Sequence, residues 1–389
     1  MGRIMIFTGK GGVGKTSLAA AHAVKAADQG MRTLLVSTDM AHNLGDLFQV
    51  QVGKIAIPVA EHLEALEIDP EYEMEHDFHH MMEAIYDMLP AIKGEDDNLA
   101  MIPGVEELFS LLKVKQIYES GKYDLVVVDC APTGETLSLL KFPELASWYM
   151  EKFFPVGKIA MKVMRPISKP LFQIKLPNGK AMNDIEHLYQ ELLDLDKLLK
   201  DRKISSVRLV SMPEKMVVEE SKRNYMYLNL YHFQMDGLYI NRILPKEADA
   251  PFFARWHQLQ EGYIQELEEA FGKVPICKIP WYDTDLNGME ALRKLAAEVL
   301  IDEHLFDVRE VVDAEVYEKT EDGYEMRLYL PFVEKEEIEL HEGKKEVILK
   351  IGNFKRDIML PSTLSQYQIA GAKMQDQTLH IQFQKSEEE

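Results

Sequence analysis

Residues 9–17 read Gly-Lys-Gly-Gly-Val-Gly-Lys-Thr-Ser, and this run constrains the fold more than any other part of the chain. It satisfies the pattern G-x-x-x-x-G-K-[ST]. An apolar segment, residues 4–7, precedes it, and helix-favouring residues 18–21 follow it. A strand, a glycine loop and a helix in this order cradle phosphate, because the loop turns backbone N–H groups inward at the positive end of the helix dipole. The alternative, a chance glycine-rich turn, does not account for the complete order of elements.

The loop predicts which residues contact a nucleotide. Lys15 would reach the β- and γ-phosphates, and the Thr16 hydroxyl would sit on Mg²⁺, so ATP and Mg²⁺ are the expected cofactors. The expected nucleotide-binding residues are Gly11, Gly12, Val13, Gly14, Lys15, Thr16 and Ser17.

Two further apolar segments end in aspartate. Residues 32–37 lead to Asp39, and residues 123–128 lead to Asp129. Ligands of open α/β sheets bind at such strand ends. Asp129 would hold Mg²⁺, through water, and Asp39 would orient an attacking water. Apolar strands also end in Asp without a catalytic reason, and Asp39 can equally be the N-cap of a following helix.

Charge and composition narrow the class of protein. The chain has 389 residues, enough for two or three domains, and a net charge of −21 that argues against a nucleic-acid-binding surface. Its two cysteines, Cys130 and Cys277, indicate a reducing compartment without a disulfide framework. Residues 1–8 are too short for a signal peptide, and no apolar run approaches ~18 residues. We therefore expect a cytoplasmic protein.

Three segments together resemble a known family. Residues 10–17, 37–44 and 129–136 are similar to the three nucleotide motifs of the ArsA-type ATPases, which include the arsenite-pump ATPase and the ATPase that guides tail-anchored membrane proteins. The resemblance covers roughly residues 1 to 300. Further matches are residues 68–70, 102–107, 213–214 and 239–241.

The resemblance implies roles for individual residues. Lys10 makes the loop a deviant Walker A motif, and in the family this lysine reaches the nucleotide of a partner subunit, which implies a homodimer. A solvated loop lysine is the alternative. Asp39 corresponds to the switch I residue that positions water. Asn241 would read the adenine edge, and Pro280 would line the base pocket.

The chain also departs from the family. Met40 stands where proline is usual in the family, and Glu135 stands where histidine is usual, which implies a different coupling between hydrolysis and client release. The CxxC pair that clamps zinc between subunits is absent, as are the cysteines that bind arsenite. There is only one P-loop, so the chain is not the tandem pump form.

Segments 70–120 and 141–200 are predicted to be mainly helical and are rich in methionine, leucine and phenylalanine. Methionine makes adaptable apolar surfaces, and in the targeting relatives these segments form a groove for a transmembrane helix. Ordinary helix core is the alternative for any single methionine. Residues 151–180 carry seven basic residues and one acidic residue among apolar ones. They are typical of a lid, of a transient membrane-surface contact or of a solvated loop.

Short alternating segments dominate the chain after residue 315. Strands are predicted at 324–330, 337–340, 346–351 and 378–383, which favours an antiparallel β-sandwich. Their order resembles the α-crystallin domain of small heat-shock proteins, with a generic sandwich as the alternative. The acidic tail lacks the Ile-x-Ile anchor by which those chaperones polymerise, so we expect no large oligomer from this domain.

The predicted fold is α/β, a P-loop NTPase with a mainly parallel sheet flanked by helices and a helical insertion, followed by the all-β domain. We expect an ATPase domain at 1–305, a linker at 306–314 and the β-domain at 315–389. The predicted activity is that of a homodimeric Mg-ATP hydrolase that opens and closes a groove for an apolar client, for targeting or chaperoning. The alternatives are an arsenite-pump subunit and a nucleotide-stabilised holdase or scaffold with little turnover.

Overall fold

The computed structural model describes residues 2–39, 44–79, 105–130, 179–247, 250–309, 315–343, 346–352, 354–364 and 366–385. The chain divides into two units, each built from two separate stretches of sequence. The first comprises Met1–Val210 and Tyr282–Val308, and the second comprises Ser211–Trp281 and Arg309–Glu389.

A mainly parallel sheet organises the first unit, in the strand order β3-β4-β2-β5-β1-β6. Only β3 runs antiparallel to its neighbour, β4. Four of these strands, β1, β2, β5 and β6, are buried along their whole length, as expected for parallel strands that helices cover on both faces. The strands are β1 (Arg3–Thr8), β2 (Thr33–Ser37), β3 (Ile57–Ala60), β4 (Leu63–Glu67), β5 (Leu125–Asp129) and β6 (Ser205–Ser211).

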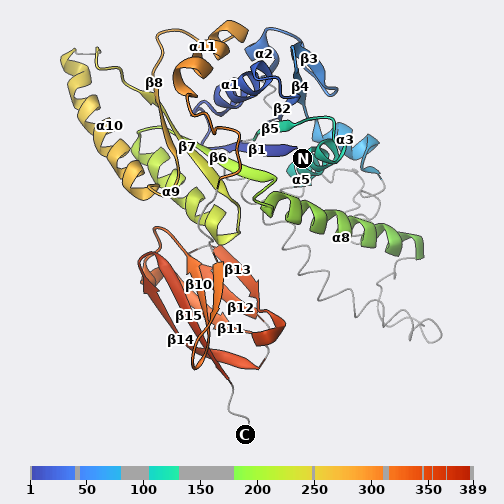
Figure 1. Cartoon of the computed structure of the whole chain (residues 1–389), viewed down its shortest axis with the longest axis vertical. Helices are drawn as coiled ribbons and strands as arrows, with labels where there is room; N and C mark the ends of the chain where they lie inside the picture. The colour runs from blue at the N-terminus through green and yellow to red at the C-terminus, as the bar shows by residue number, and fades with distance from the viewer. Residues whose placement is uncertain are drawn as a thin grey trace, which may run out of the picture. The chain divides into compact units, whose positions relative to one another are not determined.

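Helices cover this sheet. In Figure 1, α1 and α11 lie on one side of it, and α5 and α8 lie on the other. The described helices of this unit are α1 (Lys15–Asp28), α2 (Leu44–Phe48), α3 (Pro70–His76), α5 (Val105–Glu119), α8 (Gly179–Lys200) and α11 (Met289–Val299). Helix α3 begins where Asp69 accepts a hydrogen bond from the Tyr72 N–H (3.0 Å) and Pro70 occupies the first turn.

Two buried arginines hold the segment that follows α11. Arg3 donates from Nη1 to the carbonyl oxygens of Phe306 (2.6 Å) and Asp307 (2.7 Å). Arg208, which is 1% exposed, donates to the carbonyl oxygen of Leu305. Because hydrogen bonds from a charged donor are stronger than neutral ones, these contacts fix the segment against β1 and β6.

The second unit contains α9 (Lys215–Leu230), β7 (Met235–Ile243), α10 (Pro251–Ala270) and β8 (Ile276–Pro280). Strands β7 and β8 pair in parallel, and α10 packs against α9. Among the described residues, every helix falls short of the length and apolarity that crossing a bilayer requires.

The rest of the second unit is all-β. One antiparallel sheet has the order β14-β15-β10-β9, and the other has the order β11-β12-β13. Alternate residues of β12 are buried, which is the period-two pattern of a sheet with one face on a core. The elements are β9 (Glu315–Lys319), β10 (Gly323–Tyr329), η2 (Lys335–Glu337), β11 (Ile338–Glu342), β12 (Glu346–Ile351), β13 (Phe354–Met359), η3 (Ser362–Leu364), β14 (Tyr367–Gln375) and β15 (Thr378–Lys385).

The β-strands contact the end of α9 through a buried ionic cluster. Glu315 lies 2.9 Å from His232 Nε2 and 3.1 Å from Arg356 Nη2. Burial raises the pKa of Glu315, but the hydrogen bond to His232 and the charge of Arg356 outweigh it and lower this pKa to about 2. The ring of Tyr227 packs edge-on against Phe354, 3.9 Å between centroids. Polar and aromatic contacts therefore join the β-strands to α9.

The predicted fold class is confirmed, with a mainly parallel sheet flanked by helices and a C-terminal pair of antiparallel sheets. Of the predicted helical segments 70–120 and 141–200, the structure describes α3, α5 and α8. Residues 80–104 and 131–178 lie outside the described residues, as do Met40, Glu135 and most of the basic segment 151–180. The predicted linker, 306–314, starts within the segment that Arg3 holds, and its residues 310–314 are not described.

Candidate nucleotide site

The glycine loop lies directly between β1 and α1. Gly9 has φ of 152°, and a Cβ atom there would lie 2.3 Å from the Val210 carbonyl oxygen, so only glycine fits. Gly14 has φ of 95° and is the N-cap of α1. No side chain caps α1 and no acidic residue occupies its first turn, within the part of the chain that the structure describes. The first N–H groups of α1 are therefore available to an anion.

Side chains of the loop differ in exposure. Gly11 and Gly12 are exposed, Val13 is buried, and Lys10, Thr16 and Ser17 are half-buried. Lys15 is 6% exposed, and its Nζ donates to the Lys10 carbonyl oxygen at 3.4 Å. The ammonium group of Lys15 thus lies over the loop, where a phosphate cradle needs a positive charge.

The strand register brings both predicted aspartates to the same edge as this loop. Asp129, the last residue of β5, is level with Phe7 of β1 on one side and Ser37 of β2 on the other. The Thr38 N–H donates to the Asp129 carbonyl oxygen at 2.9 Å. The three strands end together, as ligand sites of parallel sheets require.

Asp129 lies in a setting suited to a divalent cation. Its side chain is 1% exposed, and burial raises its pKa to about 6, although the Thr16 hydroxyl hydrogen bond and the Lys15 charge lower it. Its Oδ1 atom is buried without a hydrogen-bond partner among the described residues. A buried carboxylate beside a hydroxyl is a hard-oxygen donor set, so the residues present fit Mg²⁺.

Asp39 follows β2 and is half-buried. Its N–H donates to the Ser37 Oγ atom at 3.2 Å, and its charge is close enough to raise the pKa of Asp129. The structure therefore brings Asp39, Asp129, Lys15 and Thr16 together.

Residues 40–43 lie outside the described residues, so the interpretation of Asp39 as a helix N-cap stays a prediction. Helix α2 is described from Leu44, and Glu67, at the end of β4, binds its first described amides. Glu67 Oε1 accepts from the Leu44 N–H at 2.9 Å and from the Gly45 N–H at 3.2 Å. Sequence reasoning missed Glu67, because an acceptor 23 residues away leaves no local capping pattern.

Asn241 and Pro280 lie in the second unit, at the carboxyl ends of the paired strands β7 and β8. A register shift separates the pair Ile240 and Lys278 from the pair Ile243 and Pro280, so Asn241 lies in an irregular stretch. Asn241 Oδ1 accepts from the Arg242 N–H at 2.8 Å, and Arg242 has φ of 56°. The two predicted base-pocket residues are therefore close to each other in the fold.

The cysteines are poor candidates for a soft-metal site. Burial raises the pKa of Cys130 to about 12 and that of Cys277 to about 11, which disfavours the thiolate that binds such metals. No group of three metal-ligating side chains gathers among the described residues, where His76 instead stacks on Tyr72.

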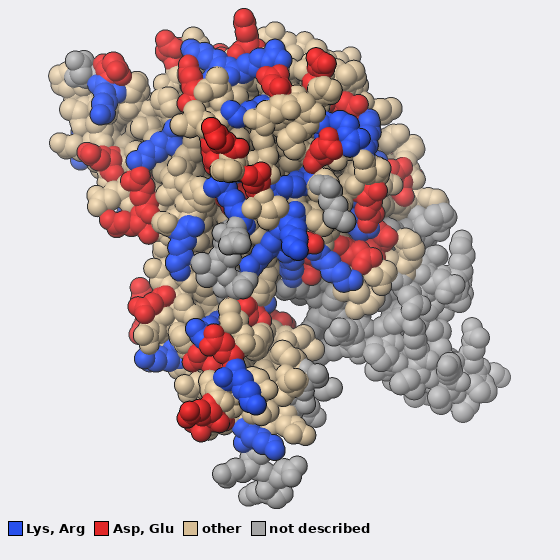
Figure 2. All heavy atoms as spheres, in the orientation of Figure 1, with Lys and Arg blue, Asp and Glu red and all other residues tan. Residues whose placement is uncertain are grey.

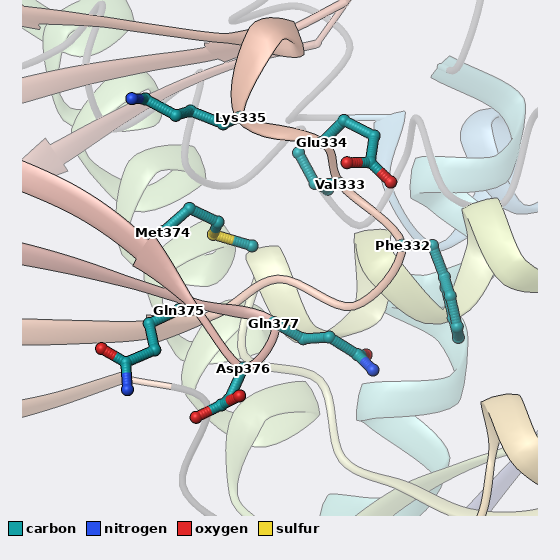
Figure 3. Close-up of a pocket in the computed structure, with 8 residues that line it drawn as sticks. All are labelled: Phe332, Val333, Glu334, Lys335, Met374, Gln375, Asp376 and Gln377. Carbon is teal, nitrogen blue, oxygen red and sulfur yellow. The ribbon is translucent and has the colours of Figure 1, made fainter.

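A cavity of about 450 Å³ lies in the β-strand part of the second unit (Figure 3). It contains none of the residues predicted to bind nucleotide. Its lining residues are Phe332, Val333, Glu334, Lys335, Met374, Gln375, Asp376 and Gln377.

The fold and the loop define the class of protein, a P-loop ATPase with its phosphate loop at the end of β1. Comparison with known families agrees. Residues 2–301 match the anion-transporting ATPase family, and residues 321–383 match the HSP20-like domain found in ArsA. The chain belongs to the anion-transporting (ArsA) ATPase family and carries the HSP20-like domain.

Known relatives span the whole chain or its first part. A protein of Prosthecochloris vibrioformis, provisionally named an arsenical pump-driving ATPase, is 36% identical over 98% of this chain and 96% of its own length. A similarly named protein of Aquifex aeolicus is 33% identical over 97% of this chain and 99% of its own length. The ATPase get3 of Pyrenophora tritici-repentis is 30% identical over 75% of this chain and 89% of its own length.

Proposed function

We propose that this ATPase works in the cytoplasm as a homodimer whose Mg-ATP cycle opens and closes a groove for an apolar client, such as a transmembrane helix. The proposed binding and hydrolysis of Mg-ATP are supported by one observation. Lys15, Thr16, Asp39 and Asp129 lie together at the ends of β1, β2 and β5. The proposed binding of an apolar client is supported by membership of the family and by a get3 relative that matches three quarters of the chain.

In the proposed cycle, the loop amides and Lys15 bind the phosphates. Thr16 and Asp129 would hold Mg²⁺, which when bound neutralises phosphate charge. Asn241 and Pro280 would hold the base. Asp39 then orients the water that attacks the γ-phosphate, and Lys10 reaches the nucleotide of the partner subunit, so that binding closes the dimer.

The test uses a labelled apolar peptide of about 20 residues, long enough to span a bilayer. Its binding is measured to the Asp39→Asn protein with and without Mg-ATP, with exposed Asp46→Asn as the matched control. We expect Asp39→Asn to bind ATP without turnover and to bind the peptide only with nucleotide. Full ATPase activity in Asp39→Asn would remove Asp39 from the mechanism, and absence of peptide binding in both states would remove the proposed client class.

The relatives' names favour one second candidate, a subunit that drives an arsenical pump. The raised pKa values of Cys130 and Cys277 argue against arsenite binding by these thiols. Arsenite should therefore leave ATPase activity unchanged, and stimulation by arsenite would favour the pump instead.

A further inference from the structure

Helix α10 carries an apolar stripe that its own unit does not cover. Phe252 is 72% exposed, Trp256 is 43% exposed and Leu259 is 41% exposed, while Tyr263 is half-buried. These residues follow the spacing i, i+4, i+7 and i+11, so they lie on one face of the helix. The buried residues of α10 are Gln260 and Leu267. The largest apolar side chains of α10 thus lie beside its buried face, not on it.

Such a stripe normally faces a partner. Large apolar side chains gathered on one exposed face mark interaction sites, and aromatic residues are the usual anchors of protein interfaces. Apolar residues spaced alternately by four and three positions are also typical of a helix that packs its side chains between those of a second helix. The occupant that fits this face is therefore another helix.

The charges of α10 indicate which helix. Its first half, residues 251–260, contains Arg255 and His257 and no carboxylate. Its second half contains no lysine or arginine, and its carboxylates are Glu261, Glu266, Glu268 and Glu269. Figure 2 shows red carboxylates along the lower, carboxyl-terminal part of this helix. Carboxylates near a helix C-terminus oppose the helix dipole, so this arrangement is unfavourable for α10 alone.

Lysines of the same unit offset only part of this charge. Glu266 pairs with Lys222, and Glu268 pairs with Lys278 at 2.6 Å. Within the described residues, Glu261, Glu269 and Arg255 form no ion pair. An antiparallel copy of α10 would place its basic half and the positive end of its dipole beside this acidic half, whereas a parallel copy would place like charges together.

We propose that α10 is a dimerisation helix that pairs antiparallel with α10 of a second copy, through Phe252, Trp256, Leu259 and Tyr263, without nucleotide. The pairing deepens the proposed homodimer and rests on it. It supplies a contact that persists through the cycle, while the contact by Lys10 depends on ATP.

The test measures the mass of the nucleotide-free full chain by sedimentation velocity across a concentration series. Wild type should be a dimer. Trp256→Glu combined with Leu259→Glu should weaken association at least ~30-fold, the effect of losing central anchors. Ile301→Glu, at a residue that is 77% exposed, is the control and should remain a dimer. Helical content by circular dichroism checks that each variant is folded.

Two further variants test orientation. Arg255→Glu should weaken the dimer at low salt and have less effect at high salt, because salt screens exposed charges. A two-fold antiparallel pair meets itself only near its centre, so Leu259→Cys should form an intermolecular disulfide and Phe252→Cys should not. Disulfides at both positions would overturn the antiparallel arrangement.

The outcomes separate this inference from the proposed function. A dimer that survives Trp256→Glu with Leu259→Glu would overturn the role of α10 and leave the nucleotide cycle intact. A wild-type chain that dimerises only with ATP would also overturn the role of α10 and retain the role of Lys10. A monomer under both conditions would overturn both dimer contacts.

Discussion

The capping of α2 by Glu67 allows a graded prediction. Glu67→Ala removes the acceptor of two amides, of which the Leu44 N–H is buried. Losing a charged cap and leaving a buried donor unsatisfied costs about 2–3 kcal/mol. Glu67→Gln keeps an acceptor oxygen but loses the charge at the helix N-terminus, so it should cost about 0.5–1 kcal/mol.

Hydrogen exchange read by mass spectrometry on a peptide covering residues 44–48 measures this loss locally. A local loss of 2–3 kcal/mol should speed exchange in Glu67→Ala by roughly 30- to 140-fold. Glu61→Ala is the control, because its side chain is 91% exposed. Equal exchange in Glu67→Ala, Glu67→Gln and the control would exclude Glu67 as the cap of α2.

Two other predictions concern Lys10 and Glu315. Lys10→Ala should abolish the ATP-dependent compaction of the dimer, measured by small-angle scattering, while each chain still binds ATP. A mutant dimer that still compacts would exclude the contact between Lys10 and the nucleotide of the partner subunit. Because the pKa of Glu315 is lowered to about 2 from 4.5, its stabilisation is present above pH 4.5 and is lost as pH falls towards 2. Glu315→Gln should therefore remove roughly 2 kcal/mol of the difference in unfolding free energy between pH 6 and pH 3, measured by urea unfolding. An unchanged pH profile would contradict the role of the cluster.

Local patterns predicted much of the fold. The segment 346–351 was predicted as a strand and is β12, Glu346–Ile351, because its alternation of apolar and polar residues is regular. The ends of β1, β2 and β5 carry the loop, Asp39 and Asp129, since parallel strands with apolar interiors place their carboxyl ends at one edge.

Contacts between distant residues were not predictable. Strand β14 was missed because Gly371 and a register shift interrupt its pattern. Arg208 is buried against a carbonyl 97 residues away, and a sequence pattern gives no reason to place a charged side chain inside. The order of strands in the sheet was likewise not predictable. Alternation of strands and helices predicts that the strands run parallel, but it does not predict which strands are neighbours.

The anchoring of residues 305–307 by Arg3 and Arg208 has a consequence for synthesis. β1 is synthesised well before the segment that completes its unit, which is translated some three hundred residues later, after all of α9, α10 and β8. At about 5–20 residues per second, the phosphate loop exists for at least roughly 15 seconds before this closure. The N-terminal strand must therefore wait in a partly folded chain, and early truncation should leave a nascent chain that chaperones bind.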